Sequence, residues 1–155
     1  MVNKLTIDGQ VKIREPEIQD AEQIAILSEQ LNYPATKTQI EQRFVQIQNN
    51  NSHIVYVATL ANDDLIGWVH GHIYDLIVMP KQVMILGLVV DKDYRNHGIG
   101  RILMQQIEQW ASLLGCDGVR LNSNIKRKEA HLFYEKIGYT NIKQSMTFAK
   151  KLQNR

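Results

Sequence analysis

The chain of 155 residues has little of what extracellular, membrane-spanning or nucleic-acid-binding proteins need. One cysteine, Cys116, excludes an internal disulfide framework. No apolar run reaches the length of a membrane-spanning helix, and the opening MVNKLTIDGQ has no signal-peptide core. The 18 Lys and Arg against 16 Asp and Glu are too balanced to favour a nucleic-acid or anionic membrane surface. We therefore expect a cytoplasmic protein without a nucleic-acid or membrane partner.

Two familiar nucleotide motifs are also missing. The third glycine of a GxGxxG dinucleotide motif would fall at Leu103, and no glycine is followed by the Gly-Lys-Ser/Thr of an NTPase loop. His70 and His72 have no further ligands at metal spacing, so we predict no metal site. With 44% hydrophobic residues and no internal repeat or low-complexity linker, residues 1–155 are predicted to form a single domain.

Periodicity predicts a chain in which helices and strands are mixed. Apolar residues recur at helical spacing over 16–31, 36–47, 98–114 and 127–137, and strand patterns cover 11–14, 53–60, 65–76, 83–90, 118–124 and 141–152. Gly115 and Gly138 are expected to end the third and fourth helices. The basic cluster Lys126–Lys128 is typical of a solvated helix start.

The run VMILGLVV at 83–90 is apolar except at Gly87, which suits a central strand covered on both faces. A glycine in a strand marks a bulge, a close approach to the backbone, or only a weak point. Because a helix follows and then another strand, at least one strand pair must be parallel. The predicted fold class is α/β with a mixed, hairpin-rich sheet.

The stretch VVDKDYRNHGIG carries this strand into the next helix. Gly98 and Gly100 would leave the backbone donors of residues 96–101 open to an anion at the helix N-terminus, with Arg95 and Arg101 close by to add charge. A plain tight turn explains the same two glycines, so the spacing alone leaves both interpretations open.

The order of elements resembles the GNAT superfamily of acyl-CoA-dependent N-acyltransferases. The resemblance rests on LVVDKDYRNHGIG, EQWA and SNIKRKEAHLFYEKIGY, and on an R/QxxGxG/A signature that is here Arg95–Gly100. It implies the GNAT fold, a mostly antiparallel sheet with flanking helices in which a parallel strand pair splays apart. It also implies acetyl-CoA as co-substrate. Many relatives form homodimers, and the sequence leaves both a homodimer and a monomer open.

The resemblance further implies which residues hold acetyl-CoA. The backbone of Leu88, Val89 and Val90 would pair with the pantetheine arm, and the pyrophosphate would rest on the loop formed by Arg95, Asn96, His97, Gly98, Ile99, Gly100 and Arg101. Many relatives have an asparagine where this chain has Arg127, which we expect to reach the cofactor phosphates or the substrate.

The implied reaction is acetyl transfer to a primary amine of a small molecule or peptide, with Tyr134 as general acid. His70 or His72 could act as the base, although half-buried histidines without a task fit the pattern equally well. Glu29, Tyr33, Trp68 and His72 are candidates for the acceptor pocket. The alternatives are a CoA-binding or regulatory module without catalysis, and an anion-binding domain unrelated to CoA.

Overall fold

The computed structural model describes residues 10–153. They fall into two compact units, the first ending at residue 122 and the second beginning at residue 123. The single domain over 1–155 stays a prediction.

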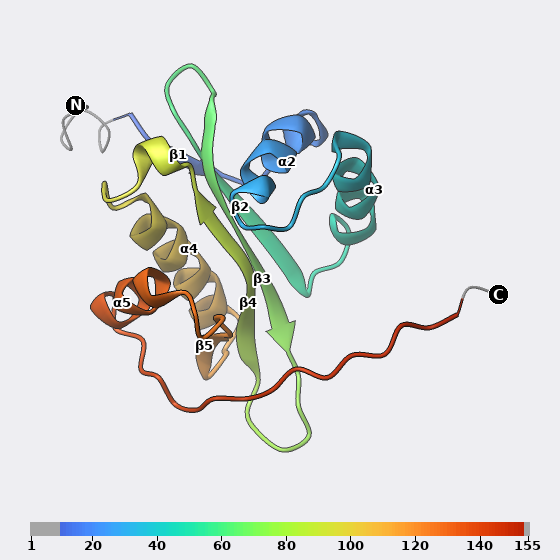
Figure 1. The fold of residues 1–155 in the computed structure, drawn as a ribbon, viewed down its shortest axis with the longest axis vertical. Coiled ribbons are helices and arrows are strands. Elements are labelled where there is room, and N and C mark those ends of the chain that lie inside the picture. The colour runs from blue at the N-terminus through green and yellow to red at the C-terminus, as the bar shows by residue number, and fades with distance from the viewer. Residues whose placement is uncertain (1–9, 154–155) are drawn as a thin grey trace. The chain divides into compact units, whose positions relative to one another are not determined.

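The first unit is built on a five-stranded mixed sheet (Figure 1). Its strands are β1 (Lys12–Arg14), β2 (His53–Thr59), β3 (Leu65–Tyr74), β4 (Gln82–Val90) and β5 (Gly118–Leu121), and they lie in this order. Neighbouring strands are antiparallel except β4 and β5, which are parallel. The predicted α/β fold with a mostly antiparallel sheet and one parallel strand pair is confirmed.

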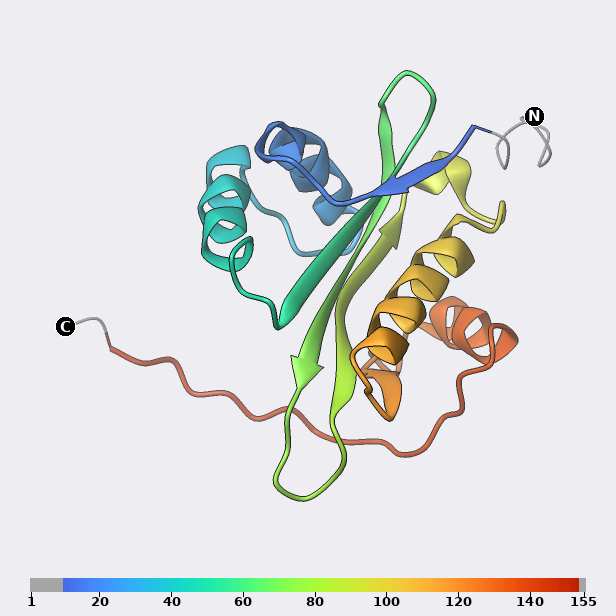
Figure 2. The ribbon, with the colours of Figure 1, turned by 180° about the vertical axis from the view of Figure 1, so that it is seen from behind.

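Helices cover both faces of this sheet (Figure 2). On one face lie α2 (Ala21–Glu29), which follows the short 3-10 helix η1 (Ile18–Asp20), and α3 (Lys37–Ile47); α4 (Ile99–Leu113) crosses the other face. The α4 side of the core holds Leu103, Met104 and Ile107, none of them exposed. Among the described residues, no helix is long and apolar enough to cross a bilayer.

The local sequence explains where these helices begin and end. Thr36 and Gln39 form a reciprocal capping box at the start of α3, so both satisfy backbone groups that the helix itself leaves unpaired. Gly98 before α4 and Gly115 after it have φ angles of 82° and 71°, which side chains rarely adopt. The predicted helix limits at these two glycines are confirmed.

The strand β4 changes its neighbours half-way along. Its parallel pairing with β5 covers only Gln82–Ile85. Opposite β3, His70 faces Gly87 and Gly71 faces Ile85, so Leu86 is the extra residue of a β-bulge. Beyond Leu86, β4 is paired with β3 alone among the described strands, which confirms the splayed strand pair.

The second unit contains α5 (Lys128–Lys136), which ends before Gly138 with its φ of 104°. The strand predicted over 141–152 is wrong, because no residue from 139 to 153 belongs to a strand. Its apolar side chains Ile142, Met146 and Phe148 are exposed. Alternation is a local signal, whereas a strand forms only where a neighbour satisfies its backbone groups, and no described strand pairs with this segment.

Candidate functional site

The start of α4 presents backbone amides without partners. Its N-cap, Gly98, has no side chain, and the first helical hydrogen bond runs from the Ile102 N–H to the Gly98 carbonyl. The amides of Ile99, Gly100 and Arg101 therefore have no acceptor within the helix. A Cβ at Gly98 would meet no atom within 4 Å, so the space beside these amides is open. The positive end of the helix dipole makes this space favourable for an anion.

The loop before α4 turns sharply. Asn96 has a φ of 66°, so that two residues of the segment 96–98 lie in the left-handed region. Asn96 and Arg101 are exposed, whereas His97 is half-buried. The Nδ1 atom of His97 is buried and has no hydrogen-bond partner among the described residues. Such a nitrogen is able to bond a group that the protein itself does not supply.

The free edge of β4 continues into this loop. The Asp91 N–H donates to the Ile66 carbonyl of β3 at 2.8 Å. Since successive residues of a strand alternate in the side to which their backbone groups point, Leu88 and Val90 direct theirs away from β3. The backbone of Val89 faces β3, and its side chain is buried in the core. Of the three residues predicted to pair with pantetheine, Leu88 and Val90 have the geometry for it.

The side chain of Arg95 bends back onto this edge. Its Nε donates to the Val90 carbonyl at 3.0 Å, and its Nη2 donates to Oε1 of Gln30 at 3.3 Å. Gln30 stands directly after α2, and the same oxygen accepts the Lys92 N–H at 2.9 Å. The guanidinium is thus bonded to protein groups although the residue is exposed, and Arg101 is a second exposed cation at the start of α4.

Three histidines gather on the sheet face opposite α4. His70 and His72 alternate with Gly71 on β3, and Gly71 lies against Ile107 of α4. His53 on β2 faces His72 in the strand register, and their ring centroids are 4.2 Å apart. Its Nδ1 lies 2.9 Å from Nε2 of His70, so one of the two nitrogens donates a hydrogen bond to the other. We call these three residues the histidine cluster.

Two members of the histidine cluster, His53 and His70, resist protonation. Burial, together with the neighbouring charges of His53 and His72, lowers the pKa of His70 to about 4. Burial also lowers the pKa of His53, as does the charge of His72. His70 is consequently neutral at pH 7, with a lone pair available on one ring nitrogen. Its register partner Gly87 borders the bulge where β4 and β5 separate.

The indole ring of Trp68 explains why a glycine stands at position 87. A Cβ at Gly87 would stand 2.7 Å from two atoms of this ring, so only glycine fits beneath it. Trp68 packs against the buried cluster of Leu27, Val57, Leu65 and Val89. Its Nε1 is buried without a partner among the described residues, which costs about 1–3 kcal/mol unless a bound molecule accepts the bond.

The other residues predicted for the acceptor pocket lie at the end of α2. Glu29 is exposed, and Tyr33 is 78% exposed in the turn that follows. A cavity of about 240 Å³ borders α2, but none of Glu29, Tyr33, Trp68 and His72 lines it. Its lining comprises Gln23, Ile26, Leu27, Asp64, Leu65, Ile66, Asp91 and Tyr94. The acceptor pocket stays a prediction.

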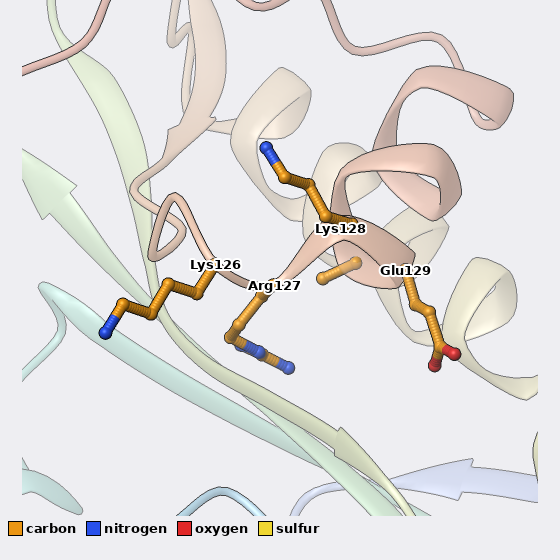
Figure 3. A pocket seen from close by; sticks show the side chains of 5 residues that line it. Lys126, Arg127, Lys128 and Glu129 are labelled. Atoms are coloured by element: carbon orange, nitrogen blue, oxygen red, sulfur yellow. The ribbon is translucent and has the colours of Figure 1, made fainter.

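In the second unit, Arg127 stands immediately before α5. It lines a cavity of about 360 Å³ with Lys126, Lys128, Glu129 and Ala130. Figure 3 shows that the long side chains spread in different directions instead of converging on one point. All three cations are exposed, as expected of a solvated helix start. The predicted contact of Arg127 with cofactor or substrate stays a prediction.

Tyr134 lies on the half-buried face of α5. Its ring packs edge-on against Phe133 and Tyr139, with centroids 5.1 and 6.1 Å away. Burial raises the pKa of the Tyr134 hydroxyl, and the positive charge of Arg127 opposes this rise. The hydroxyl therefore keeps its proton at neutral pH, which a general acid requires.

Two residues escaped the sequence analysis. His53 contacts His70 and His72 because of the register in which β2 and β3 pair, and no motif in HIVYVATL predicts that contact. Gln30 is an ordinary polar residue at a helix end until the loop folds back onto it. Within residues 10–153, no group of three His, Cys, Asp or Glu side chains is placed to hold a metal ion. The histidine cluster is no exception.

Comparison with known proteins decides the family. The sequence profile of the Acetyltransferase (GNAT) family matches residues 19–139, which is most of the chain. The chain belongs to the GNAT family. The resemblance seen in the sequence around Arg95–Gly100 and Tyr134 is thereby confirmed at the level of family.

Two curated relatives match this GNAT chain over shorter stretches. The uncharacterized N-acetyltransferase YhdJ of Bacillus subtilis (strain 168) is 36% identical over 61 residues, which are 39% of this chain and 43% of the relative. Aminoglycoside N(6')-acetyltransferase type 1 of Acinetobacter genomosp. 13 is 30% identical over 64 residues, 41% of this chain and 44% of the relative. The matches span less than half the length of either relative.

A solved structure supports the GNAT fold. It is AAC(6')-Iy in complex with the bisubstrate analog CoA-S-monomethyl-acetylneamine, with a TM-score of 0.80 and 16% sequence identity. The comparison covers 92% of this chain and 99% of that chain. At this identity the likeness concerns the fold.

The residues of this GNAT chain fit an acyl-CoA. The open amides at the start of α4 suit a pyrophosphate, because they offer donors at the positive end of a helix. The free edge offers the N–H and C=O groups of Leu88 and the N–H of Val90 to an amide-containing arm, while the Val90 carbonyl already accepts Nε of Arg95. Gly98 leaves room beside the α4 amides, since a Cβ there would meet no atom within 4 Å.

Proposed function

We propose that this GNAT protein transfers an acetyl group from acetyl-CoA to a primary amine of a small molecule or a peptide. The proposal depends on one observation: the free edge of β4 continues along the chain into the start of α4, where no side chain caps the backbone amides. Pantetheine would pair with Leu88 and with the N–H of Val90, whose carbonyl accepts Nε of Arg95, and the pyrophosphate would accept from the amides of residues 98–101. Asn96, His97 and Arg101 complete the loop.

Acetyl-CoA supplies the activated acetyl group as a thioester. The amine nitrogen forms a bond to the carbonyl carbon while the bond from that carbon to sulfur breaks, so the amine must lose a proton and the sulfur must gain one. A backbone N–H of the free β4 edge would stabilise the negative charge that develops on the carbonyl oxygen. Tyr134 would donate the proton to the departing sulfur, and its raised pKa is compatible with that role.

The proton of the amine would pass to the histidine cluster. His70 is neutral at pH 7, but a base with a pKa of about 4 holds a proton weakly. Its hydrogen bond to His53 would allow the proton to move on toward the less buried part of the cluster. His72 faces the same side of the sheet as His70 and remains the alternative base.

We infer that the acceptor is a small polar amine such as an aminosugar. The support is twofold: one relative is an aminoglycoside acetyltransferase, and the structural neighbour holds a CoA-acetylneamine analog. In this chain Glu29 offers a carboxylate that an ammonium group would contact, and Trp68 offers an indole N–H that still lacks an acceptor. Arg127 would contact either cofactor phosphates or acceptor.

An amine panel with a thiol-release assay tests the proposal. The panel should contain aminoglycosides, simple aminosugars and lysine peptides, each with acetyl-CoA and the purified protein. Release of CoA that depends on one amine class identifies the acceptor. Failure of CoA and acetyl-CoA to bind in a thermal-shift experiment would refute the proposed function.

The variant Tyr134→Phe separates an enzyme from a CoA-binding module. We expect CoA affinity to stay within twofold of wild type and turnover to fall by 10²–10⁴-fold, as about that much depends on a positioned general acid. Unchanged turnover would remove Tyr134 from the mechanism. Binding of CoA by wild type without turnover of any amine would favour the module.

A further inference from the structure

We propose that Gln30 and Arg95 form a clamp that positions the loop at the start of α4, without either side chain touching acetyl-CoA. The proposal rests on the proposed acetyl-CoA site, and it assigns the Arg95 side chain a positioning role. We call the pair the Gln30–Arg95 clamp. It joins three parts of the first unit: the end of α2, the end of β4 and the loop 95–98.

The first observation is the number of bonds that meet at Gln30. Its Oε1 accepts the Lys92 N–H at 2.9 Å and Nη2 of Arg95 at 3.3 Å. An amide oxygen has two lone pairs, so both bonds together use its full capacity. Gln30 is the residue directly after α2, so its backbone is held by the end of the helix.

The second observation concerns the other nitrogen of Arg95. Its Nε donates to the Val90 carbonyl at 3.0 Å, on the edge of β4 that faces away from β3. A planar guanidinium with donors in a fixed fork can bridge two acceptors at once, which a lysine ammonium on its flexible stem cannot do in the same geometry. Two N–H donors of Arg95 are therefore already bonded to protein oxygens.

The third observation is what the loop otherwise lacks. The Tyr94 N–H bonds to the Asp91 carbonyl, but the N–H groups of residues 96–98 make no backbone-to-backbone hydrogen bond in the described chain. Asn96 and Gly98 have left-handed φ angles, so the segment belongs to no regular element. The hydrogen bonds that fix this segment to its surroundings are those of the Arg95 side chain.

The clamp predicts a specific effect on CoA binding. Removing the Gln30 acceptor would free the loop, and CoA would then have to order it on binding. Loss of one such hydrogen bond corresponds to about a three- to tenfold rise in Kd. The effect acts through the loop, so the amides of residues 95–101 should also exchange with deuterium several-fold faster in the protein without ligand.

Gln30→Leu is the test variant, and Gln23→Leu is its matched control. Gln23 lies on α2, and its Oε1 accepts the Leu65 N–H of β3 at 2.8 Å instead of a donor in the segment 92–95. Both variants lose an amide oxygen that holds a backbone N–H to α2. Only Gln30→Leu should raise the CoA Kd, measured by calorimetry, and only it should speed exchange in 95–101.

Two further variants check the chemistry. Gln30→Glu keeps an oxygen acceptor for both donors, so CoA Kd should return to within twofold of wild type. Arg95→Lys keeps the charge but loses the fork, and Kd should rise as much as in Gln30→Leu. The double variant Gln30→Leu/Arg95→Lys should have a CoA Kd no higher than that of the worse single variant, because both substitutions break the same clamp.

Each outcome decides the proposal. Wild-type Kd and wild-type exchange in Gln30→Leu would overturn the clamp, as would an equal loss of affinity in Gln23→Leu. Full affinity in Arg95→Lys would show that Arg95 acts on the phosphates by charge alone, and would overturn it too. Faster exchange in Gln30→Leu, in a protein that does not bind CoA at all, would refute the proposed function and leave the clamp as a device that orders the loop.

Discussion

Replacing Gly98 with alanine should reduce CoA affinity much more than it reduces stability. The φ angle of 82° places Gly98 in the left-handed region, where an alanine costs about 1–2 kcal/mol. No atom lies within 4 Å of the new methyl group, so the protein itself offers no clash. The methyl group would instead stand in the open space beside the amides of α4, where the pyrophosphate is proposed to bind.

Gly115→Ala is the matched control at the opposite end of α4. Its φ is 71°, and again a Cβ would meet nothing within 4 Å. Both variants should lose the same 1–2 kcal/mol, or about 2–8 °C in Tm for a protein of this size. Only Gly98→Ala should lose hydrogen bonds to phosphate, which are worth about 1.5–3 kcal/mol, or roughly 10- to 150-fold in Kd.

Thermal unfolding with and without CoA measures both effects. At a CoA concentration one hundred times the wild-type Kd, the wild-type protein gains about 2.7 kcal/mol. A Gly98→Ala variant with a thirtyfold higher Kd would gain only about 0.9 kcal/mol at that concentration, while Gly115→Ala keeps the full gain. Equal CoA stabilisation of both variants would refute the placement of the pyrophosphate at the start of α4.

Three further predictions concern stability. Gly87→Ala should cost about 1–3 kcal/mol in urea unfolding, because its Cβ would lie 2.7 Å from the Trp68 ring; unchanged stability would show that the indole moves freely. The pKa of His70 is about 4, below its ordinary 6.5, so the unfolded chain binds the extra proton between these values. The free energy of unfolding should fall by about 2 kcal/mol from pH 7 to pH 5, and His70→Asn should remove most of this slope. Asp20→Asn should cost about 2 kcal/mol at pH 7, because Asp20 accepts both Arg14 bonds at 2.7 and 3.0 Å; a loss below 0.5 kcal/mol would contradict this.

Asp20 also sets an expectation for acid. Burial by itself raises the pKa of Asp20, but the hydrogen bonds from Arg14 and the Glu17 N–H, with the charge of Arg14, outweigh it, and the pKa is lowered. A carboxyl group with a lowered folded pKa contributes stability above its unfolded value of 3.8, and this contribution is lost as pH falls below that value. The loss of stability from His70 falls between pH 6.5 and 4, and the loss from Asp20 falls below pH 3.8. One titration of the free energy of unfolding against pH can therefore separate them.

Local patterns predicted the elements of the sheet and the limits of its helices. Gly98 and Gly115 mark the ends of α4 because only glycine adopts their φ angles easily, and such a preference belongs to one residue. The apolar run 83–90 predicted a central strand, and β4 does lie between β3 and β5, although Leu86 at its bulge is 52% exposed. The prediction of a strand over 141–152 failed, because alternation of apolar and polar residues does not show whether a neighbouring strand is present.

The sequence by itself determined the family, the fold class and the loop at the start of α4, because these depend on residue order and on backbone preferences that are read locally. The tertiary structure decided what depends on long-range register: His53 meets His70 because β2 and β3 pair as they do. It likewise decided that Arg95 bends back to Val90 and Gln30, since Gln30 lies 65 residues away in the chain. A side chain's type can be read from the sequence, but its partner is fixed only when distant segments pack together.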